Sequence, residues 1–175
     1  MNRPIQKLEL TPMTRPELFH YSQNIVTSVE SRDPSKRGSG CYKPAGFWVS
    51  VDEPDEDGES YGWPAWCESE DYCLDRLGVR HRVDLINAER LLWITTADDL
   101  SWFDNIFGEV GPYNREINWP LVADQFAGVV IAPYQRSKRF DIDWYYGWDC
   151  ASGIIWDASI VRRITQVLQQ QEKHT

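Results

Sequence analysis

The stretch GVVIA, Gly128–Ala132, contains no polar side chain. A short, wholly apolar and largely β-branched run is typical of a strand that is buried on both faces of a sheet. We therefore expect this stretch to be a central strand. The other segments with strand-like patterns are Glu17–Tyr21, Gly46–Val51, Val79–Ile86, Arg90–Ile94, Trp144–Trp148 and Gly153–Trp156.

Helical patterns lie between these strands at irregular intervals. Trp63–Leu77 has Pro64 in its first turn, and Gly78 follows its last residue. Thr96 is a typical helix N-cap. We expect further helices after Thr96 with Leu100, Phe103 and Phe107 buried, over Trp119–Phe126 with Asn118 as cap, and after Asp157 with Ile160, Val161, Ile164, Val167 and Leu168 at helical spacing.

The order of these elements argues against the parallel α/β folds. Strict strand–helix alternation is absent, and neither GxGxxG nor GxxxxGK occurs. A chain of 175 residues with 42% apolar residues is long enough to bury one core. We therefore expect a single α+β domain over 1–175 with split antiparallel β-sheets, a lead-in over 1–16 and a frayed tail over 170–175.

Acidic residues are concentrated in one part of the chain. Ten of the 27 Asp and Glu residues lie between Asp52 and Asp75, where no Lys or Arg occurs. The rest of the chain is close to neutral, so the net charge of −9 does not exclude a nucleic-acid partner. The acidic loop 52–59 is expected either to stay solvated or to dock a basic partner.

Membrane and metal-binding functions find no support in the sequence. No apolar run approaches the ~20 residues of a membrane helix, and residues 1–10 lack a signal-peptide pattern. We therefore expect a cytoplasmic protein with reduced thiols, no membrane segment and no metal. The cysteines, which form no CxxC pair and have no histidine at metal-ligand spacing, are Cys41, Cys67, Cys73 and Cys150.

Two short segments carry side chains that suit a planar ligand. His20 lies in LFHYS, Leu18–Ser22, where a binding role and a half-buried histidine satisfied by the backbone both fit. In GFWVS, Gly46–Ser50, a strand places Trp48 and Ser50 on the same face. A flat ring beside a hydroxyl offers a planar amide ring one stacking surface and one hydrogen bond, unless Trp48 packs into the core.

In chain order, these segments and a late hairpin form three motifs. They are His20–Ser22, then Gly46–Ser50, then Ala127–Ile131 with Gly153–Ser159. Together they resemble the motifs of the ADP-ribosyltransferase superfamily, in its small bacterial or phage toxin and effector type. The resemblance spans Phe19–Ile160 and implies split antiparallel β-sheets with peripheral helices, and NAD⁺ as a substrate.

The resemblance also assigns residues to the NAD⁺ site. It implies that His20 hydrogen-bonds a ribose hydroxyl, that Trp48 stacks on nicotinamide and that Ser50 supports the site. Tyr21 and Lys43 are expected as neighbours in the same site. Of these two, Lys43 is the expected partner for the pyrophosphate.

The chain departs from the family pattern at the catalytic position. The family's glutamate falls on Ser152, which is expected at the NAD⁺ site but lacks the negative charge that stabilises a positive ribose. The nearest carboxylate is Asp149, to which we assign the catalytic role beside His20. The alternative for Asp149 is a turn carboxylate that bonds backbone N–H groups. Further candidates are Asp141, Asp143 and Glu68.

The expected function is NAD⁺-dependent transfer of ADP-ribose to a macromolecular acceptor, either protein or nucleic acid, as in a toxin of a toxin–antitoxin or phage-defence system. Arg136, Lys138 and Arg139, with the aromatic Trp144–Tyr146, suit a nucleic-acid or acidic acceptor, although a solvated polar loop also fits. Two alternatives stay open. One is a catalytically inactive interaction protein that binds a basic partner, and the other is an NAD⁺ glycohydrolase. For the acidic loop 52–59 two roles are open: it repels phosphate from the mouth of the site, or it docks a basic partner such as a neutralising antitoxin.

Overall fold

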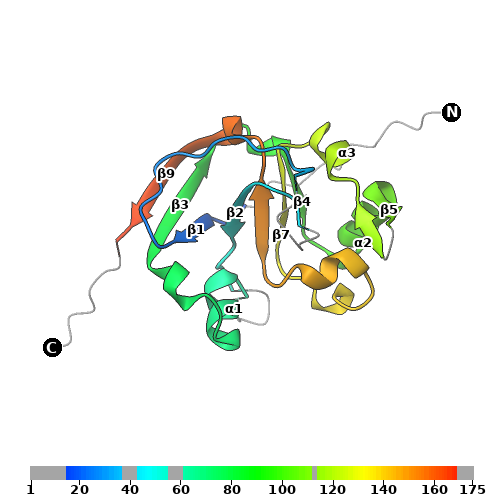
Figure 1. The fold of residues 1–175 in the computed structure, drawn as a ribbon, viewed down its shortest axis with the longest axis horizontal. Coiled ribbons are helices and arrows are strands. Elements are labelled where there is room, and N and C mark those ends of the chain that lie inside the picture. Colours follow the sequence, from blue (N-terminus) through cyan, green and yellow to red (C-terminus); the bar gives the residue numbers. More distant parts are fainter. Residues whose placement is uncertain (1–14, 37–42, 55–60, 112–113, 169–175) are drawn as a thin grey trace.

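The computed structural model describes residues 15–36, 43–54, 61–111 and 114–168. They form an α+β fold built on one seven-stranded mixed sheet, with helices beside and below it (Figure 1). The strand order is β4-β7-β8-β2-β1-β3-β9. The strands are β1 (Leu18–Ser22), β2 (Phe47–Ser50), β3 (Val79–Leu85), β4 (Leu91–Ile94), β7 (Gly128–Ile131), β8 (Ser152–Ile155) and β9 (Val161–Val167).

The sheet is antiparallel, as expected, at every neighbouring pair except β4 and β7, which run parallel. A parallel pair requires a long crossover connection. Here the chain between β4 and β7 supplies it, since this segment contains two helices and a small hairpin. In Figure 1 these elements lie together at the β4 end of the sheet.

The stretch GVVIA is confirmed as an interior strand. All four residues of β7 are buried, and the strand lies between β4 and β8. The two strands β7 and β8 approach closely at Gly153, where an added Cβ would lie 2.6 Å from Val130 Cγ2 and 2.7 Å from Val129 O. A glycine is therefore required at this point in the middle of the sheet.

The sheet is weakly joined between β1 and β2. Five residue pairs join β1 to β3, and four join β2 to β8, but β1 and β2 share only the pair Phe19–Ser50. Beyond this pair the two strands diverge. Backbone groups that face the gap need hydrogen-bond partners other than the opposite strand.

α2 (Ala97–Phe107) begins where the sequence predicts. Thr96 and Asp99 form a capping box, in which each side chain accepts a hydrogen bond from the other residue's backbone N–H. The buried face of the helix is the predicted one. Its residues are Leu100, Phe103 and Phe107.

The chain between α2 and β7 contains elements that the sequence predicts only in part. β5 (Gly108–Val110) and β6 (Arg115–Ile117) form a two-stranded hairpin that no pattern indicated. α3 (Trp119–Ala123) is capped by Asn118, as predicted, but ends before the predicted Phe126. The cap residue was therefore a better guide than the length of the apolar run.

The prediction of one helix over Trp63–Leu77 is wrong. The segment contains α1 (Trp63–Glu70) and a separate 3₁₀ helix at Leu74–Leu77. Asp71 adopts the left-handed conformation, with φ of 51°, and ends α1 well before the predicted terminator Gly78. Aspartate is one of the few non-glycine residues that readily tolerate this conformation.

The prediction of a strand over Trp144–Trp148 is also wrong. Asp143–Gly147 forms a 3₁₀ helix, and the buried residues Trp144, Tyr145 and Trp148 follow helical spacing instead of strict alternation. The strand was suggested by the aromatic residues of this segment, which are common in strands. The core contacts of these rings require a turn of helix instead.

The predicted last helix is a strand. Asp157 caps only a 3₁₀ turn at Ala158–Ile160, where its carboxylate accepts a hydrogen bond from Ser159 N–H. The chain then continues as β9, which pairs along β3. β-branched residues favour a strand, and the open edge of β3 provides a partner that outweighs the helical spacing. The lead-in up to residue 14, residues 37–40 of the predicted loop 31–40, and the tail 170–175 lie outside the described residues.

The close approach at Gly153 leads to a first prediction. Gly153→Ala forces a methyl group against Val129 and Val130, so the free energy of unfolding should fall by about 2 kcal/mol, within the range for overpacked cores. Gly78→Ala is the matched control, because its nearest atom would be 3.8 Å away and its φ of −60° suits alanine. Urea denaturation of both variants tests this, and equal stabilities would contradict it.

Candidate functional site

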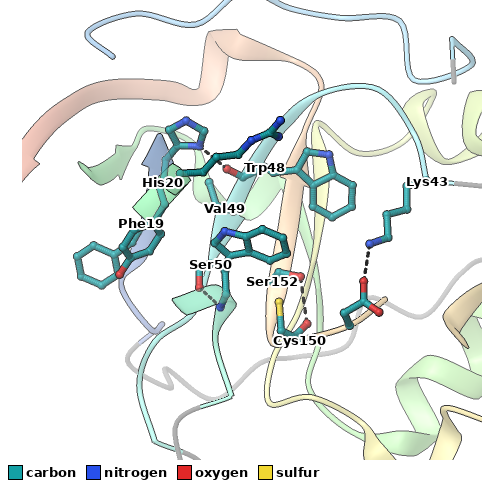
Figure 2. Close-up of a pocket in the computed structure, with 12 residues that line it drawn as sticks. Phe19, His20, Lys43, Trp48, Val49, Ser50, Cys150 and Ser152 are labelled. Carbon is teal, nitrogen blue, oxygen red and sulfur yellow. Dashed lines mark hydrogen bonds and ion pairs between the residues drawn. The ribbon is translucent and has the colours of Figure 1, made fainter. Parts of the chain in front are cut away.

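A pocket of about 330 Å³ lies where β1 and β2 diverge, beside the start of β8 (Figure 2). The residues that the sequence assigns to the NAD⁺ site, with Asp149 as its first catalytic candidate, all line this one pocket. Most of them lie on strands that are far apart in the sequence and adjacent in the sheet. These residues are His20, Tyr21, Lys43, Trp48, Ser50, Asp149 and Ser152.

His20 bridges the gap between the diverging strands. Its Nδ1 lies 2.8 Å from the carbonyl oxygen of Trp48, so the ring takes the place of the missing backbone partner on β1. Burial lowers the pKa of His20 from its usual 6.5, although the Trp48 carbonyl opposes the shift. The ring is therefore neutral at pH 7. Because a carbonyl only accepts, Nδ1 carries the proton and Nε2 is left as an acceptor.

His81 supports His20 from the neighbouring strand β3. Its ring is fully buried, and its Nδ1 donates to the carbonyl oxygen of His20 at 3.2 Å. Its Nε2 accepts a hydrogen bond from Val26 N–H at 2.9 Å. Both nitrogens are therefore used in fixing the backbone, and the His81 side chain is a structural support for the pocket wall.

Lys43, Trp48 and Asp149 form a cation site at the opposite side of the pocket. Lys43 Nζ lies 2.9 Å from Asp149 Oδ2 and 5.5 Å from the centre of the Trp48 ring. The ring of Trp48 also packs against the buried Trp148, with 5.0 Å between ring centres. A positive charge is thus held between an aromatic ring and a carboxylate.

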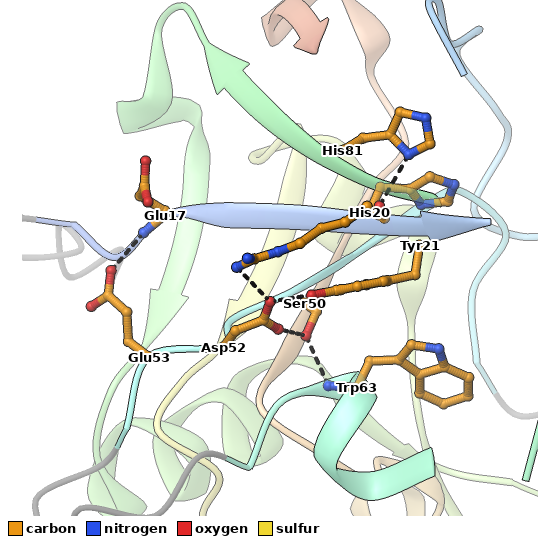
Figure 3. Close-up of polar contacts among 9 residues, drawn as sticks. Glu17, His20, Tyr21, Ser50, Asp52, Glu53, Trp63 and His81 are labelled. Atoms are coloured by element: carbon orange, nitrogen blue, oxygen red, sulfur yellow. Dashed lines mark hydrogen bonds and ion pairs between the residues drawn. The ribbon is translucent and has the colours of Figure 1, made fainter. Parts of the chain in front are cut away.

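Ser50 takes part in a polar network that ties β1, β2, β3 and α1 together (Figure 3). Its hydroxyl donates to Asp52 Oδ1 at 2.6 Å and accepts from Trp63 N–H at 2.8 Å. Asp52 also accepts hydrogen bonds from the Tyr21 hydroxyl and from Arg80. Burial and the hydrogen bond to Asp52 raise the pKa of Tyr21 well above 10, so its hydroxyl stays a donor. Ser50 and Tyr21 are therefore committed to the framework of the pocket.

Ser152 and Cys150 form the end of the pocket next to Asp149. The Ser152 hydroxyl donates to the carbonyl oxygen of Cys150 at 3.0 Å, within the turn that leads into β8. Burial raises the pKa of the Cys150 thiol to about 12. Cys150 is therefore a neutral thiol at pH 7 and is unsuited to act as a nucleophile.

Some expected residues lie elsewhere. Asp141, Asp143 and Glu68 are not among the residues that line the pocket. Asp143 instead accepts a hydrogen bond from the backbone N–H of Arg115. Of the acidic loop 52–59, the part from residue 55 onward lies outside the described residues.

Arg76 is the main pocket residue that sequence reasoning missed. It lies on the 3₁₀ helix after Asp71, and its place in the wall depends on the break in the predicted helix. No local pattern marks it as a ligand-binding residue. The other lining residues to which the sequence analysis gave no role are Phe19, Val49, Trp63 and Cys150.

Within the described residues, no group of three or more His, Cys, Asp or Glu side chains is arranged to hold a metal ion. No helix of this part of the chain is long and apolar enough to cross a membrane. No match was found to a protein-family model, a curated protein or a solved structure.

The network around Asp52 leads to a second prediction. Asp52→Asn replaces the carboxylate that accepts hydrogen bonds from Ser50, Tyr21 and Arg80 with an uncharged amide. The free energy of unfolding should therefore fall by about 2 kcal/mol. Glu53→Gln is the control. This neighbouring carboxylate makes an exposed contact with the Glu17 N–H, and its loss should cost less than about 0.5 kcal/mol. Similar losses in both variants would contradict the role given to Asp52.

A third prediction concerns His20 and pH. The unfolded chain binds a proton at His20 near pH 6.5, whereas the folded chain does so only at lower pH. The contribution of His20 to stability is therefore complete above pH 6.5 and is lost as the pH falls toward the lower, folded pKa. Between pH 7 and 5 the wild type should lose more stability than His20→Gln. An NMR titration midpoint for His20 above 6.5 would contradict this.

Proposed function

We propose that this chain is an NAD⁺-dependent ADP-ribosyltransferase, and that the pocket at the gap between β1 and β2 binds the nicotinamide–ribose end of NAD⁺. The pocket volume of about 330 Å³ lies near the lower end of the range for ligand sites, roughly 300–1,000 Å³. That size suits one end of the dinucleotide better than the whole molecule.

The cation site carries the proposal. The nicotinamide ring of NAD⁺ is positively charged and flat, and the ammonium of Lys43 lies between the flat ring of Trp48 and the carboxylate of Asp149. A pyridinium ring in this position gains both a stacking surface and a charge partner. In this proposal the pyridinium ring takes the place of the Lys43 ammonium beside Trp48 and Asp149.

The other polar groups of the pocket suit the remainder of that ligand. Nε2 of His20 has no hydrogen-bond partner among the described residues, and in this proposal it accepts a hydrogen bond from a ribose hydroxyl. Lys43, once displaced from Asp149, becomes available to the pyrophosphate. This exchange would couple substrate binding to release of the Asp149 carboxylate.

In the proposed reaction these groups act on the bond between nicotinamide and ribose. The bond between ribose C1′ and the nicotinamide nitrogen breaks, and its electron pair neutralises the pyridinium ring. An oxygen or nitrogen of the acceptor bonds to C1′ and loses its proton to water. Positive charge grows on the ribose as the bond breaks, and Asp149 would stabilise it.

Sheet topology supports the finer fold assignment as well. The three motifs that resemble the superfamily lie on β1, β2 and the β7–β8 hairpin, which are consecutive in the sheet. The single pair between β1 and β2 divides the sheet into two sides, as expected for split sheets. An ADP-ribosyltransferase-like fold is therefore part of the proposal.

The Lys43–Asp149 ion pair also favours a second candidate function. If Lys43 never leaves Asp149, the carboxylate stays neutralised, and Ser152 offers no charge in its place. The chain would then be a non-catalytic member of the same fold. It would act through a bound partner instead of through chemistry.

Nicotinamide release tests the proposal. Wild-type protein incubated with NAD⁺ and cell extract should release nicotinamide and transfer labelled ADP-ribose to a macromolecule. Asp149→Asn should slow release on the order of 100-fold, because the amide carries no charge. Asp98→Asn, an exposed carboxylate in the first turn of α2 and outside the pocket, should keep the wild-type rate.

Lys43→Met tests the cation site with a phosphate-free probe. This variant should bind the 1-methylnicotinamide cation, which carries the pyridinium charge, more tightly than the wild type does, and its preference for NAD⁺ over this probe should shrink. A wild type with neither nicotinamide release nor a thermal shift on adding NAD⁺ would contradict the proposal. Binding without release would favour the non-catalytic candidate, and release without labelling would identify a glycohydrolase.

A further inference from the structure

A second surface lies next to the pocket, on the connection between β7 and β8. We call it the aromatic–basic surface, and it is part of the orange turns below β7 in Figure 1. It combines exposed rings with positive side chains on two short 3₁₀ helices and the residues between them. Its residues are Arg136, Lys138, Arg139, Phe140 and Tyr146.

The exposure of the two rings is the first observation. The Phe140 side chain is 83% exposed and that of Tyr146 is 57% exposed, yet the two rings lie against each other with 5.9 Å between their centres. Among the other aromatic residues that the structure describes, only Tyr72 is also exposed, and it is less so, at 51%. A paired, exposed set of rings adds little to the core and is typical of a binding surface.

The charges around these rings are the second observation. Arg139 lies over the ring of Tyr146 at 5.5 Å, and Arg136 lies over the ring of Tyr61 at 4.2 Å. Between residues 136 and 140 there are three positive residues and no acid. Asp141 and Asp143 follow, so the local field is positive but weak.

The surface is continuous with the pocket, which is the third observation. Gly147 directly follows Tyr146, and a Cβ on it would lie 4.0 Å from Lys43 Cε. Arg136 lies over the ring of Tyr61, which stacks on the buried Tyr134 with 5.1 Å between the ring centres, and this connects the surface to the core. The surface and the pocket therefore adjoin at Gly147 and Lys43.

We propose that the aromatic–basic surface binds single-stranded nucleic acid and presents a nucleotide to the pocket as the acceptor of ADP-ribose. The second half of this inference rests on the proposed function. In that step a nitrogen or oxygen of the nucleotide bonds to ribose C1′ and gives its proton to water, while the electron pair of the broken bond goes to nicotinamide. The binding itself requires no NAD⁺.

A single strand fits these observations better than a duplex or an acidic peptide. Unpaired bases stack on exposed rings, whereas the bases of a duplex already stack on one another. An acidic peptide would use the positive charges but would leave Phe140 without a flat partner. Because the local charge is weak, stacking should supply most of the affinity and the salt dependence should be shallow.

Fluorescence anisotropy without NAD⁺ tests the binding. Full-length protein is titrated into a labelled mixed-sequence single strand, as RNA and as DNA, and into the matching duplex. The wild type should bind at least one single strand more tightly than the duplex. Phe140→Ala/Tyr146→Ala should weaken that binding about 10-fold or more. Val110→Ala, which trims an exposed side chain on β5, should leave it unchanged.

Any of the following results would overturn the proposal, provided that thermal melting shows the variants to be folded. They are no binding of either strand, equal binding to the duplex, and equal binding by wild type and the double variant. Displacement of the strand by polyglutamate at equal charge would do the same, since it would identify an acidic peptide site. Oligonucleotide binding without nicotinamide release would support the surface and contradict the proposed function. Nicotinamide release without such binding would do the reverse.

Discussion

The pocket depends on a single constraint, namely that β1 and β2 share only the pair Phe19–Ser50. Two adjacent strands that diverge leave backbone groups facing a gap, and such groups must find other partners. His20 supplies one, since its ring bonds the Trp48 carbonyl, and the fully buried His81 holds the backbone of His20 in turn. The opening is therefore built into the sheet and is lined by neutral imidazole.

A gap in a sheet also weakens it, and the Asp52 network offsets this weakness. Asp52 follows β2 and accepts from Tyr21 on β1 and Arg80 on β3, while Ser50 links it to the first N–H of α1. A carboxylate with several charged or polar donors in a half-buried site is stabilised by each of them. The strands can therefore separate at the pocket and stay joined beside it.

The sequence predicted the parts of this arrangement that local pattern determines. The buried run Gly128–Ala132 correctly predicted an interior strand, and the capping residue Thr96 correctly predicted the start of α2. Asp157 and the apolar spacing after it wrongly predicted a helix, because β3 offers a pairing edge that only the folded chain contains. The residues of the short motifs were predicted to share one site, and they line one pocket. Arg76 was not predicted, because its place in the pocket wall follows a helix break at Asp71 that no local pattern marks.

The Lys43–Asp149 pair determines what the site is able to do. Each side chain is roughly a quarter exposed, so the pair is neither fully desolvated nor fully screened, and a competing cation or anion is able to separate it. NAD⁺ carries both: a positive ring for Asp149 and Trp48, and a negative pyrophosphate for Lys43. In the proposed reaction the substrate therefore separates Lys43 from Asp149 and so frees the carboxylate that its own cleavage requires. A ligand with only one of these charges would leave one member of the pair without a partner.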